Sequence, residues 1–293
     1  MKININIFLL IFMILILMYL NFFFKKIEKF YDKSDIILGI HTVFILKENI
    51  PFLEEWIVYH KKIGFDKFYL YDNTGSKGRN GSTKNVNKRK INFDNLVTLT
   101  DKQLNIELNN ILDRHPEIKY IKWQPRNDKN EIIYGYDRSV EDYNNNYSNE
   151  CSYTTFIDID EFIYVNSNIS LKKYIESKNV DKLIIQQTKM IDRYCGAVIN
   201  DTVMDMTDSL VIDKQWGPKN IIKNKVISLR GDFNMHDIPI SSKNIYNCPK
   251  TELFFFHYNI SNWSYKWMKN YLKKDNFKKK KGLNLKILVK LII

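Results

Sequence analysis

Residues 36–46 read IILGIHTVFIL, a nearly continuous apolar run that is rich in β-branched side chains. Such a run is typical of a strand that is buried on both faces of a parallel sheet. Pro51 then opens a predicted helix with apolar residues at helical spacing, and Gly64 ends it. Residues 68–71, FYLY, predict the next strand. This strand–helix–strand unit indicates an α/β fold with a mostly parallel sheet flanked by helices.

The same alternation continues along the chain. We expect a strand at 96–99, a helix at 102–114, a strand at 118–123 and a polar, partly helical stretch at 131–150. The chain has 293 residues, 44% of them hydrophobic, which is enough to bury a sizeable core. We therefore predict one α/β domain over residues 36–270.

The positive charge of the chain is concentrated at its ends. The formal net charge of +12 raises the question of a nucleic-acid partner. However, residues 271–290 hold eight lysines against one aspartate, whereas residues 36–270 carry only about +3. A body so close to neutral lacks the basic face that phosphates require, so we expect no nucleic-acid partner.

An apolar segment near the N-terminus predicts a membrane anchor. Residues 7–24 read IFLLIFMILILMYLNFFF, which is long enough to cross a bilayer as a helix, and no small-residue cleavage pattern follows. We expect a short tail at 1–6, an uncleaved signal-anchor at 7–24, a stem at 25–35 and a basic, apolar tail at 271–293. The protein would then be a single-pass protein of a Golgi- or ER-type membrane, or of a viral or host membrane, with its orientation open.

Residues 154–162 read TTFIDIDEF, an apolar strand that ends in three carboxylates. Alternation along a strand would put Asp158 and Asp160 on one face, where two carboxylates suit a hard cation such as Mn²⁺ or Mg²⁺. Such a cation can neutralise the charge that grows as a nucleoside diphosphate departs. The alternative is a surface acidic turn that binds no metal. Asp72 and Asn73 follow strand 68–71, at the sheet edge where nucleotides bind in α/β proteins.

Several of these segments, taken together, resemble glycosyltransferase family 92 and its close family-2-like relatives. The matching segments are KENIPFLEEW at 47–56, YH at 59–60, YDN at 71–73, FIDIDEF at 156–162, GPKNII at 217–222 and FFHY at 255–258. The resemblance covers about residues 36–270. It implies a GT-A-like fold and a membrane-anchored enzyme that moves a hexose, with galactose expected, from a nucleoside diphosphate sugar to a glycan hydroxyl.

The resemblance also implies roles for individual residues. The donor would be bound by Glu55, Asp72 and Asn73 at the nucleoside and by Lys219 at the diphosphate. The metal would be held by Asp158 and Asp160, with His257 or His236 as a further ligand.

An inverting transferase also needs a general base near the acceptor hydroxyl. Four residues qualify by type: Asp192, Glu161, Asp201 and Asp205. We expect Asp192, because it follows the apolar segment 183–185 and should lie near the acceptor, and we keep Glu161 as the second candidate.

The chain departs from the family pattern at several positions. Glu48-Asn49 stands where the family usually has Asn-Glu, and Ser264-Tyr265 replaces acidic residues after the His-Tyr pair. These changes leave two other functions open. One is an inactive GT-A-fold protein that serves as a membrane-attached binding or scaffold protein. The other is a different metal-dependent enzyme that acts on phosphate esters.

Overall fold

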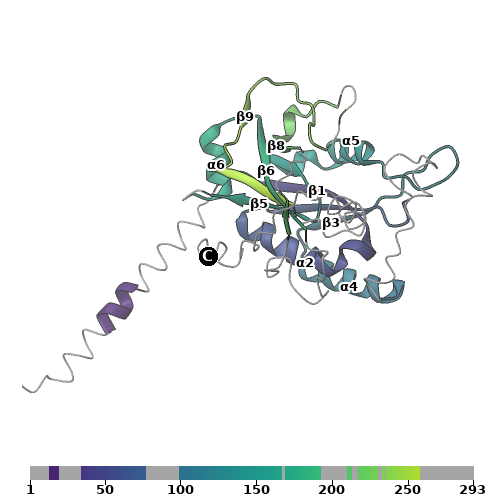
Figure 1. Cartoon of the computed structure of the whole chain (residues 1–293), viewed down its shortest axis with the longest axis horizontal. Helices are drawn as coiled ribbons and strands as arrows, with labels where there is room; N and C mark the ends of the chain where they lie inside the picture. The colour runs from purple at the N-terminus through teal and green to yellow at the C-terminus, as the bar shows by residue number, and fades with distance from the viewer. Residues whose placement is uncertain are drawn as a thin grey trace, which may run out of the picture.

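The computed structural model of the chain describes residues 13–19, 34–76, 99–166, 169–192, 210–212, 217–229, 233 and 235–257. Its body is a ten-stranded sheet with helices on both faces (Figure 1). The strands are β1 (Leu38–Phe44), β2 (Lys67–Asp72), β3 (Ile118–Lys122), β4 (Tyr153–Phe156), β5 (Glu161–Val165), β6 (Lys182–Asp192), β7 (Leu210–Ile212), β8 (Lys219–Lys223), β9 (Ile245–Asn247) and β10 (Leu253–His257). The helices are α2 (Leu46–Ile63), α4 (Asp101–Arg114), α5 (Tyr136–Asn146) and α6 (Leu171–Lys178), with short 3-10 helices η2 (Ser148–Glu150) and η3 (Asn224–Val226).

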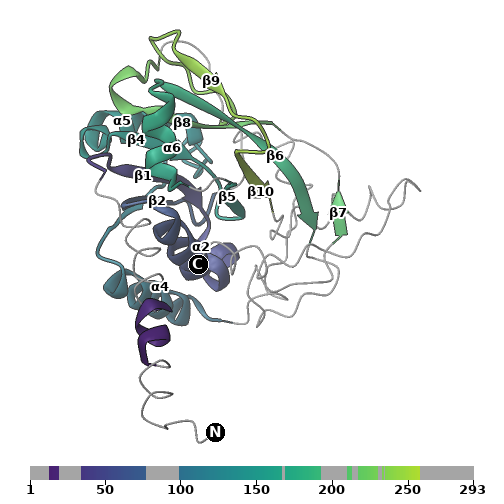
Figure 2. The same ribbon diagram turned by 90° about the vertical axis from the view of Figure 1, so that its left-hand side faces the viewer.

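The sheet has a parallel half and a mixed half. Its strands are hydrogen-bonded in the order β3-β2-β1-β4-β8-β6-β10-β5, and the first four run parallel. β8 and β5 run antiparallel to their neighbours, whereas β6 and β10 are parallel to each other. The long strand β6 also pairs with β7 and β9 and bends across the view in Figure 2. The predicted α/β class is therefore confirmed, and the sheet is mixed; its β3-β2-β1-β4 half is parallel as expected.

β1 is buried along its whole length, as its apolar sequence predicted. Leu38, Ile40 and Phe44 belong to the core that includes α2, α4 and α6, and Val43 belongs to the core under α5. Figure 1 shows α2 and α4 on one side of the sheet and α5 on the other. Because successive strand residues point to opposite faces, β1 needs apolar side chains on both.

The β1-α2-β2 unit is confirmed by the parallel pairing of its two strands. α2 begins at Leu46, before Pro51, at which the sequence predicted its start. The earlier start is stabilised by a neighbouring loop, because Thr74 Oγ1 accepts a hydrogen bond from Leu46 N at 2.9 Å. Gly64 ends the helix as predicted, with a φ of 115° that favours glycine.

The later elements agree with the sequence wherever the structure describes them. α4 and β3 confirm the predicted helix at 102–114 and the strand at 118–123, and α5 is the helical part of 131–150. Residues 96–98 lie outside the described part of the chain, so the strand expected at 96–99 stays a prediction.

The predicted anchor at 7–24 is described only at residues 13–19. These form a short helix whose apolar side chains are 42–68% exposed. Among the described residues, no helix is both long enough and apolar enough to cross a bilayer. The tail at 1–6, most of the stem at 25–35 and the tail at 271–293 lie outside the described residues, so these assignments stay predictions.

Two histidines are buried within the body without a counter-ion. His41 on β1 has no exposed surface and lies among the rings of Tyr71, Tyr143 and Phe156, with centroids 4.6, 5.9 and 5.2 Å away. Neither of its ring nitrogens makes a well-formed hydrogen bond with the described residues. His60 on α2 is equally buried. Burial lowers the pKa of each imidazole to about 3, so both are neutral in the native protein.

We predict that acid destabilises the fold through these two histidines. The unfolded chain binds a proton at each near pH 6.5, whereas the folded protein does so only near its lowered pKa of about 3. Stability is therefore full above the unfolded pKa and falls as the pH drops from about 6.5 towards 3. Each histidine should lower the free energy of unfolding by about 2 kcal/mol between pH 8 and pH 5.

Denaturant unfolding of the full chain at these two pH values measures the loss. His41→Leu should lose about 2 kcal/mol less than the unsubstituted protein. Phe156→Leu is the matched control, because it loosens the same packing around His41 without removing a titratable group. If His41→Leu has the same pH dependence as the unsubstituted protein, the assignment is wrong.

Candidate functional site

One edge of the sheet gathers residues from distant parts of the sequence. β4 ends just before the acidic residues, and β10, which runs in the same direction, ends at His257. β5 and β8 run the opposite way, so their first residues, Glu161 and Lys219, reach the same edge. His257 and Glu161 are direct partners in the sheet register. Open α/β sheets bind their ligands at this edge, beyond the carboxyl ends of the parallel strands.

The three carboxylates lie in and beside a turn. β4 ends at Phe156 and β5 begins at Glu161, so Asp158 and Asp160 occupy the connection between the strands. The expectation that strand alternation sets both on one face is therefore wrong. The chain must leave β4 there, because β5 joins the far end of the sheet beside β10. Two hydrogen bonds close the turn: Glu161 N donates to Asp158 O at 3.0 Å, and Asp158 N donates to Glu161 Oε2 at 2.9 Å.

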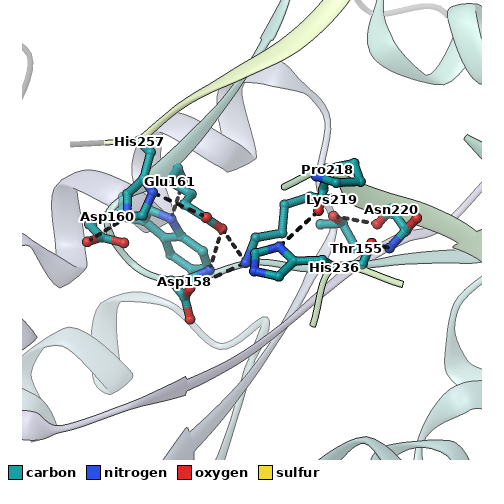
Figure 3. A network of polar contacts seen from close by, with 10 residues as sticks. Thr155, Asp158, Asp160, Glu161, Pro218, Lys219, Asn220, His236 and His257 are labelled. Atoms are coloured by element: carbon teal, nitrogen blue, oxygen red, sulfur yellow. Dashed lines mark hydrogen bonds and ion pairs between the residues drawn. The ribbon is translucent and has the colours of Figure 1, made fainter. Parts of the chain in front are cut away.

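Lys219 is the cation beneath this turn. Its Nζ lies 2.8 Å from Glu161 Oε2 and 3.3 Å from Asp158 Oδ2 (Figure 3). The lysine side chain has no exposed surface, and that of Glu161 is 2% exposed. Burial alone would lower the pKa of Lys219, but the two carboxylates raise it, so the ammonium stays charged. Both of these contacts lie inside the protein, and the diphosphate role expected for Lys219 stays a prediction.

His257 and Asp160 form a second ion pair, with 3.3 Å between Nε2 and Oδ2. Burial alone would lower the pKa of His257, but Asp160 and the neighbouring carboxylates raise it to about 9. The imidazole is therefore protonated at neutral pH. Burial acts to raise the pKa of Asp160, yet His257 and Lys219 lower it overall. Nδ1 of His257 is buried and makes no hydrogen bond with the described residues.

Asp160 and His257 fit a divalent cation as two of its ligands. Neighbouring ligands of an octahedral ion with bonds of about 2.1 Å lie about 3 Å apart. The Asp160–His257 distance of 3.3 Å is close to that value. An imidazole beside a carboxylate favours Mn²⁺ over Mg²⁺, which prefers oxygen ligands. In the described part of the chain, no three His, Cys, Asp or Glu side chains form a metal-binding group. Asp158 contacts Lys219 and is not a third member of the Asp160–His257 pair.

Asp72 and Asn73 lie at the carboxyl end of β2, and the protein itself uses most of their polar groups. The Asp72 carboxylate accepts a hydrogen bond from Tyr120 OH at 2.7 Å. Asn73 is fully buried, and its Nδ2 donates to Trp123 O and Ile133 O, both at 3.0 Å. Both residues therefore shape the loop beyond β2. Their expected contact with the nucleoside stays a prediction.

Helix α2 donates two side-chain hydrogen bonds to the first residues of β5. The sequence did not indicate this contact. Trp56 Nε1 donates to Glu161 O at 2.9 Å, and Tyr59 OH donates to Ile163 O at 2.7 Å. Trp56 has no exposed surface. No local pattern indicated which carbonyl it bonds, because Glu161 lies far along the chain. Glu55 is half-buried on the same helix, and its nucleoside role stays a prediction.

His236 lies beside Lys219, away from Asp160 and His257 in Figure 3. Its Nδ1 is 3.2 Å from Pro218 O, and its own carbonyl accepts a hydrogen bond from Asn220 Nδ2 at 3.0 Å. The structure brings His257 into contact with Asp160 of the turn, at 3.3 Å. A metal-binding role for His236 stays a prediction.

Asp192 is the last residue of β6, and Leu210 of β7 is its partner in the register. It follows Met190, which is paired with His257, so its backbone reaches the same edge of the sheet. Its side chain lies outside the described residues, as do Asp201 and Asp205. The choice of general base stays a prediction.

Comparison with known proteins identifies no family. No model of a known protein family matches the chain, and no curated protein sequence matches it. Staphylococcus aureus TarS is among the similar solved structures. TarS 1–349 matches with a TM-score of 0.38 and 11% identity, over 83% of this chain and 67% of that one. Its complex with UDP-GlcNAc matches with a TM-score of 0.38 and 11% identity, over 76% and 59% of the two chains. Its complex with UDP gives 0.36 and 10%, over 76% and 60%. At TM-scores this low the similarity supports no conclusion, so membership of glycosyltransferase family 92 stays a prediction.

Proposed function

We propose that this chain is a metal-dependent glycosyltransferase that moves a hexose from a nucleoside diphosphate sugar to a glycan hydroxyl. The main support is the Asp160–His257 pair, 3.3 Å apart at the edge of the sheet where α/β proteins bind nucleotides. Asp158 lies in the same turn with 30% of its side chain exposed. The family resemblance of these segments supports the donor class, with galactose as the expected sugar.

Asp160 and His257 would hold Mn²⁺ or Mg²⁺, and Asp158 would contribute a further oxygen. His257 would release its Nε2 proton to solvent as the cation binds, because only a neutral imidazole ligates a metal. When bound, the cation would supply electrostatic stabilisation of the charge on the departing diphosphate. The chain's own cations have a different task. Lys219 and protonated His257 lie among three carboxylates, Asp158, Asp160 and Glu161, and so reduce the repulsion within the turn before any ligand arrives.

Asp192 is our candidate for the general base. Its backbone reaches the same edge of the sheet at the end of β6. Glu161 is less suited to that role, because its carboxylate is almost fully buried and already contacts Lys219. A base must lie within hydrogen-bond distance of the acceptor hydroxyl, which a buried carboxylate cannot reach. The acceptor would be a glycan, whether linked to protein or to lipid.

We also propose that the apolar segment anchors the enzyme in a membrane. Residues 13–19 form a helix in which every side chain is apolar or aromatic, and all are at least 42% exposed. A helix that is hydrophobic on all sides is stable inside a protein core or in a bilayer. The continuous apolar sequence of residues 7–24, which is long enough to cross a bilayer, supports a lipid environment for this one.

A nucleotide screen on the full chain in detergent tests the donor class. In the presence of Mn²⁺, we expect one of the UDP- or GDP-sugars to raise the melting temperature of the protein. The rise should be about 5 °C when that sugar nucleotide is present at about 100 times its own Kd. Asp160→Asn and His257→Gln should each weaken Mn²⁺ binding by about tenfold or more. Transfer of the radiolabelled sugar to glycan acceptors then measures turnover.

Asp113→Asn is the matched control for Asp160→Asn, because it neutralises an exposed aspartate on α4, away from this edge. It should leave the shift unchanged. A folded protein that responds to none of the nucleotides would contradict the proposal and favour the scaffold function. Nucleotide binding that is insensitive to both Mn²⁺ and Asp160→Asn would contradict the metal site.

Membrane fractionation tests the anchor. The full chain should sediment with membranes, resist extraction by high salt and alkaline carbonate, and dissolve in detergent. Replacing Leu15 and Leu17 with arginine should release a large part of it, because each charge at a helix centre costs about 3 kcal/mol on insertion. Replacing the same two residues with alanine is the control, and equal release by both pairs would argue against a spanning helix.

A further inference from the structure

Lys219 is separated from any ligand by its own contacts. It begins β8 beneath the acidic turn, and its side chain has no exposed surface. Its ammonium contacts Glu161 at 2.8 Å and Asp158 at 3.3 Å. A lysine that binds a diphosphate must present its ammonium to that ligand. In this arrangement, two protein carboxylates occupy that position.

The Lys219–Glu161 pair is a weak source of stability but a strong geometric constraint. Removing two charges from water costs free energy that offsets much of their attraction. Removing only one partner is far more costly, because the other charge stays buried without compensation. Neither side chain can therefore move out of the buried ion pair unless the other moves with it. The position of one determines the position of the other.

Glu161 connects this constraint to three further elements. Its Oε2 also accepts the hydrogen bond from Asp158 N at 2.9 Å, which fixes the acidic turn. Its carbonyl accepts from Trp56 Nε1 of α2 at 2.9 Å, and its Oε1 lies 3.8 Å from His257 Nδ1 of β10. The turn, α2, β8 and β10 thus meet at a single residue, α2 through its backbone carbonyl and the others through its carboxylate, as Figure 3 shows for the charged groups.

We propose that Lys219 and Glu161 are a positioning pair. They hold the turn so that Asp160 and the exposed part of Asp158 face the donor diphosphate and its cation, and neither of the two touches the donor or the acceptor. This inference rests on the proposed function. It gives Lys219 and Glu161 a role beneath the site, in place of the diphosphate contact and the general base that the sequence led us to expect.

Four variants of the full chain test the proposal: Lys219→Met, Glu161→Gln, the double variant with both changes, and Lys182→Met as control. Lys182 is also a buried strand lysine, with 3% of its side chain exposed and its Nζ 2.7 Å from Asp237 Oδ1, and it starts β6 away from the turn. For each variant we would measure the melting temperature, the Kd for Mn²⁺ alone by electron paramagnetic resonance, and the Kd for UDP at saturating Mn²⁺.

If the two residues are a positioning pair, the variants should change the melting temperature and the Mn²⁺ affinity but not the UDP affinity. Each single variant at the turn should lower the melting temperature by about 10 °C, because it removes the nearest oppositely charged partner of a buried group. The double variant should recover most of that loss yet still bind Mn²⁺ about tenfold more weakly, since the turn is no longer held. The Kd of the double variant for UDP at saturating Mn²⁺ should stay within about twofold of that of the unsubstituted protein. The Kd of Lys182→Met for Mn²⁺ should also stay within about twofold of the unsubstituted value.

Two results would overturn the proposal while leaving the proposed function intact. A double variant that binds Mn²⁺ as tightly as the unsubstituted protein would show that the pair does not position the metal ligands. A tenfold or greater loss of UDP affinity at saturating Mn²⁺ would show that Lys219 contacts the diphosphate. If the unsubstituted protein binds neither Mn²⁺ nor any nucleotide, the proposed function fails, and the positioning role fails with it.

Discussion

A lysine ammonium that is cut off from water needs carboxylates around it, and this requirement shapes the rest of the site. Lys219 lies on β8 between β4 and β6, with no exposed side-chain surface. Glu161 must therefore stay close to it, where Lys219 opposes the burial that raises the pKa of the Glu161 carboxyl. Because the same carboxylate accepts the backbone N–H of Asp158, one charge on β8 determines how the chain runs from β4 into β5.

The second ion pair completes the arrangement from the other side of the turn. His257 comes from the end of β10 and meets Glu161 in the register, which brings an imidazolium with a pKa of about 9 next to Asp160. Two positive groups then face three negative ones, Asp158, Asp160 and Glu161. The near balance lets the turn form without a ligand. The remaining negative charge still favours the approach of a cation.

The fold class and the edge of the sheet could be predicted, because both follow from local patterns. An apolar run such as 36–46 marks a buried strand, and polar residues after such a strand mark the ligand edge. The turn at Asp158 could not be predicted, because it depends on β5 pairing with β10, which comes much later in the chain. The burial of Lys219 could not be predicted for the same reason. Its burial results from β8 inserting between two other strands, and no local spacing records that.

A polar residue in a motif can serve a site by touching the ligand or by holding a neighbour that does. Exposure separates the two uses here. Asp158, His257 and Asp160 keep 30%, 17% and 13% of their side chains exposed, whereas Glu161 keeps 2% and Lys219 none. A fully buried side chain can contact a ligand only if the protein rearranges. The buried ion pair resists that rearrangement. The chemistry of this site is therefore expected from a few oxygen and nitrogen atoms at the surface, held in place by charges that lie beneath them.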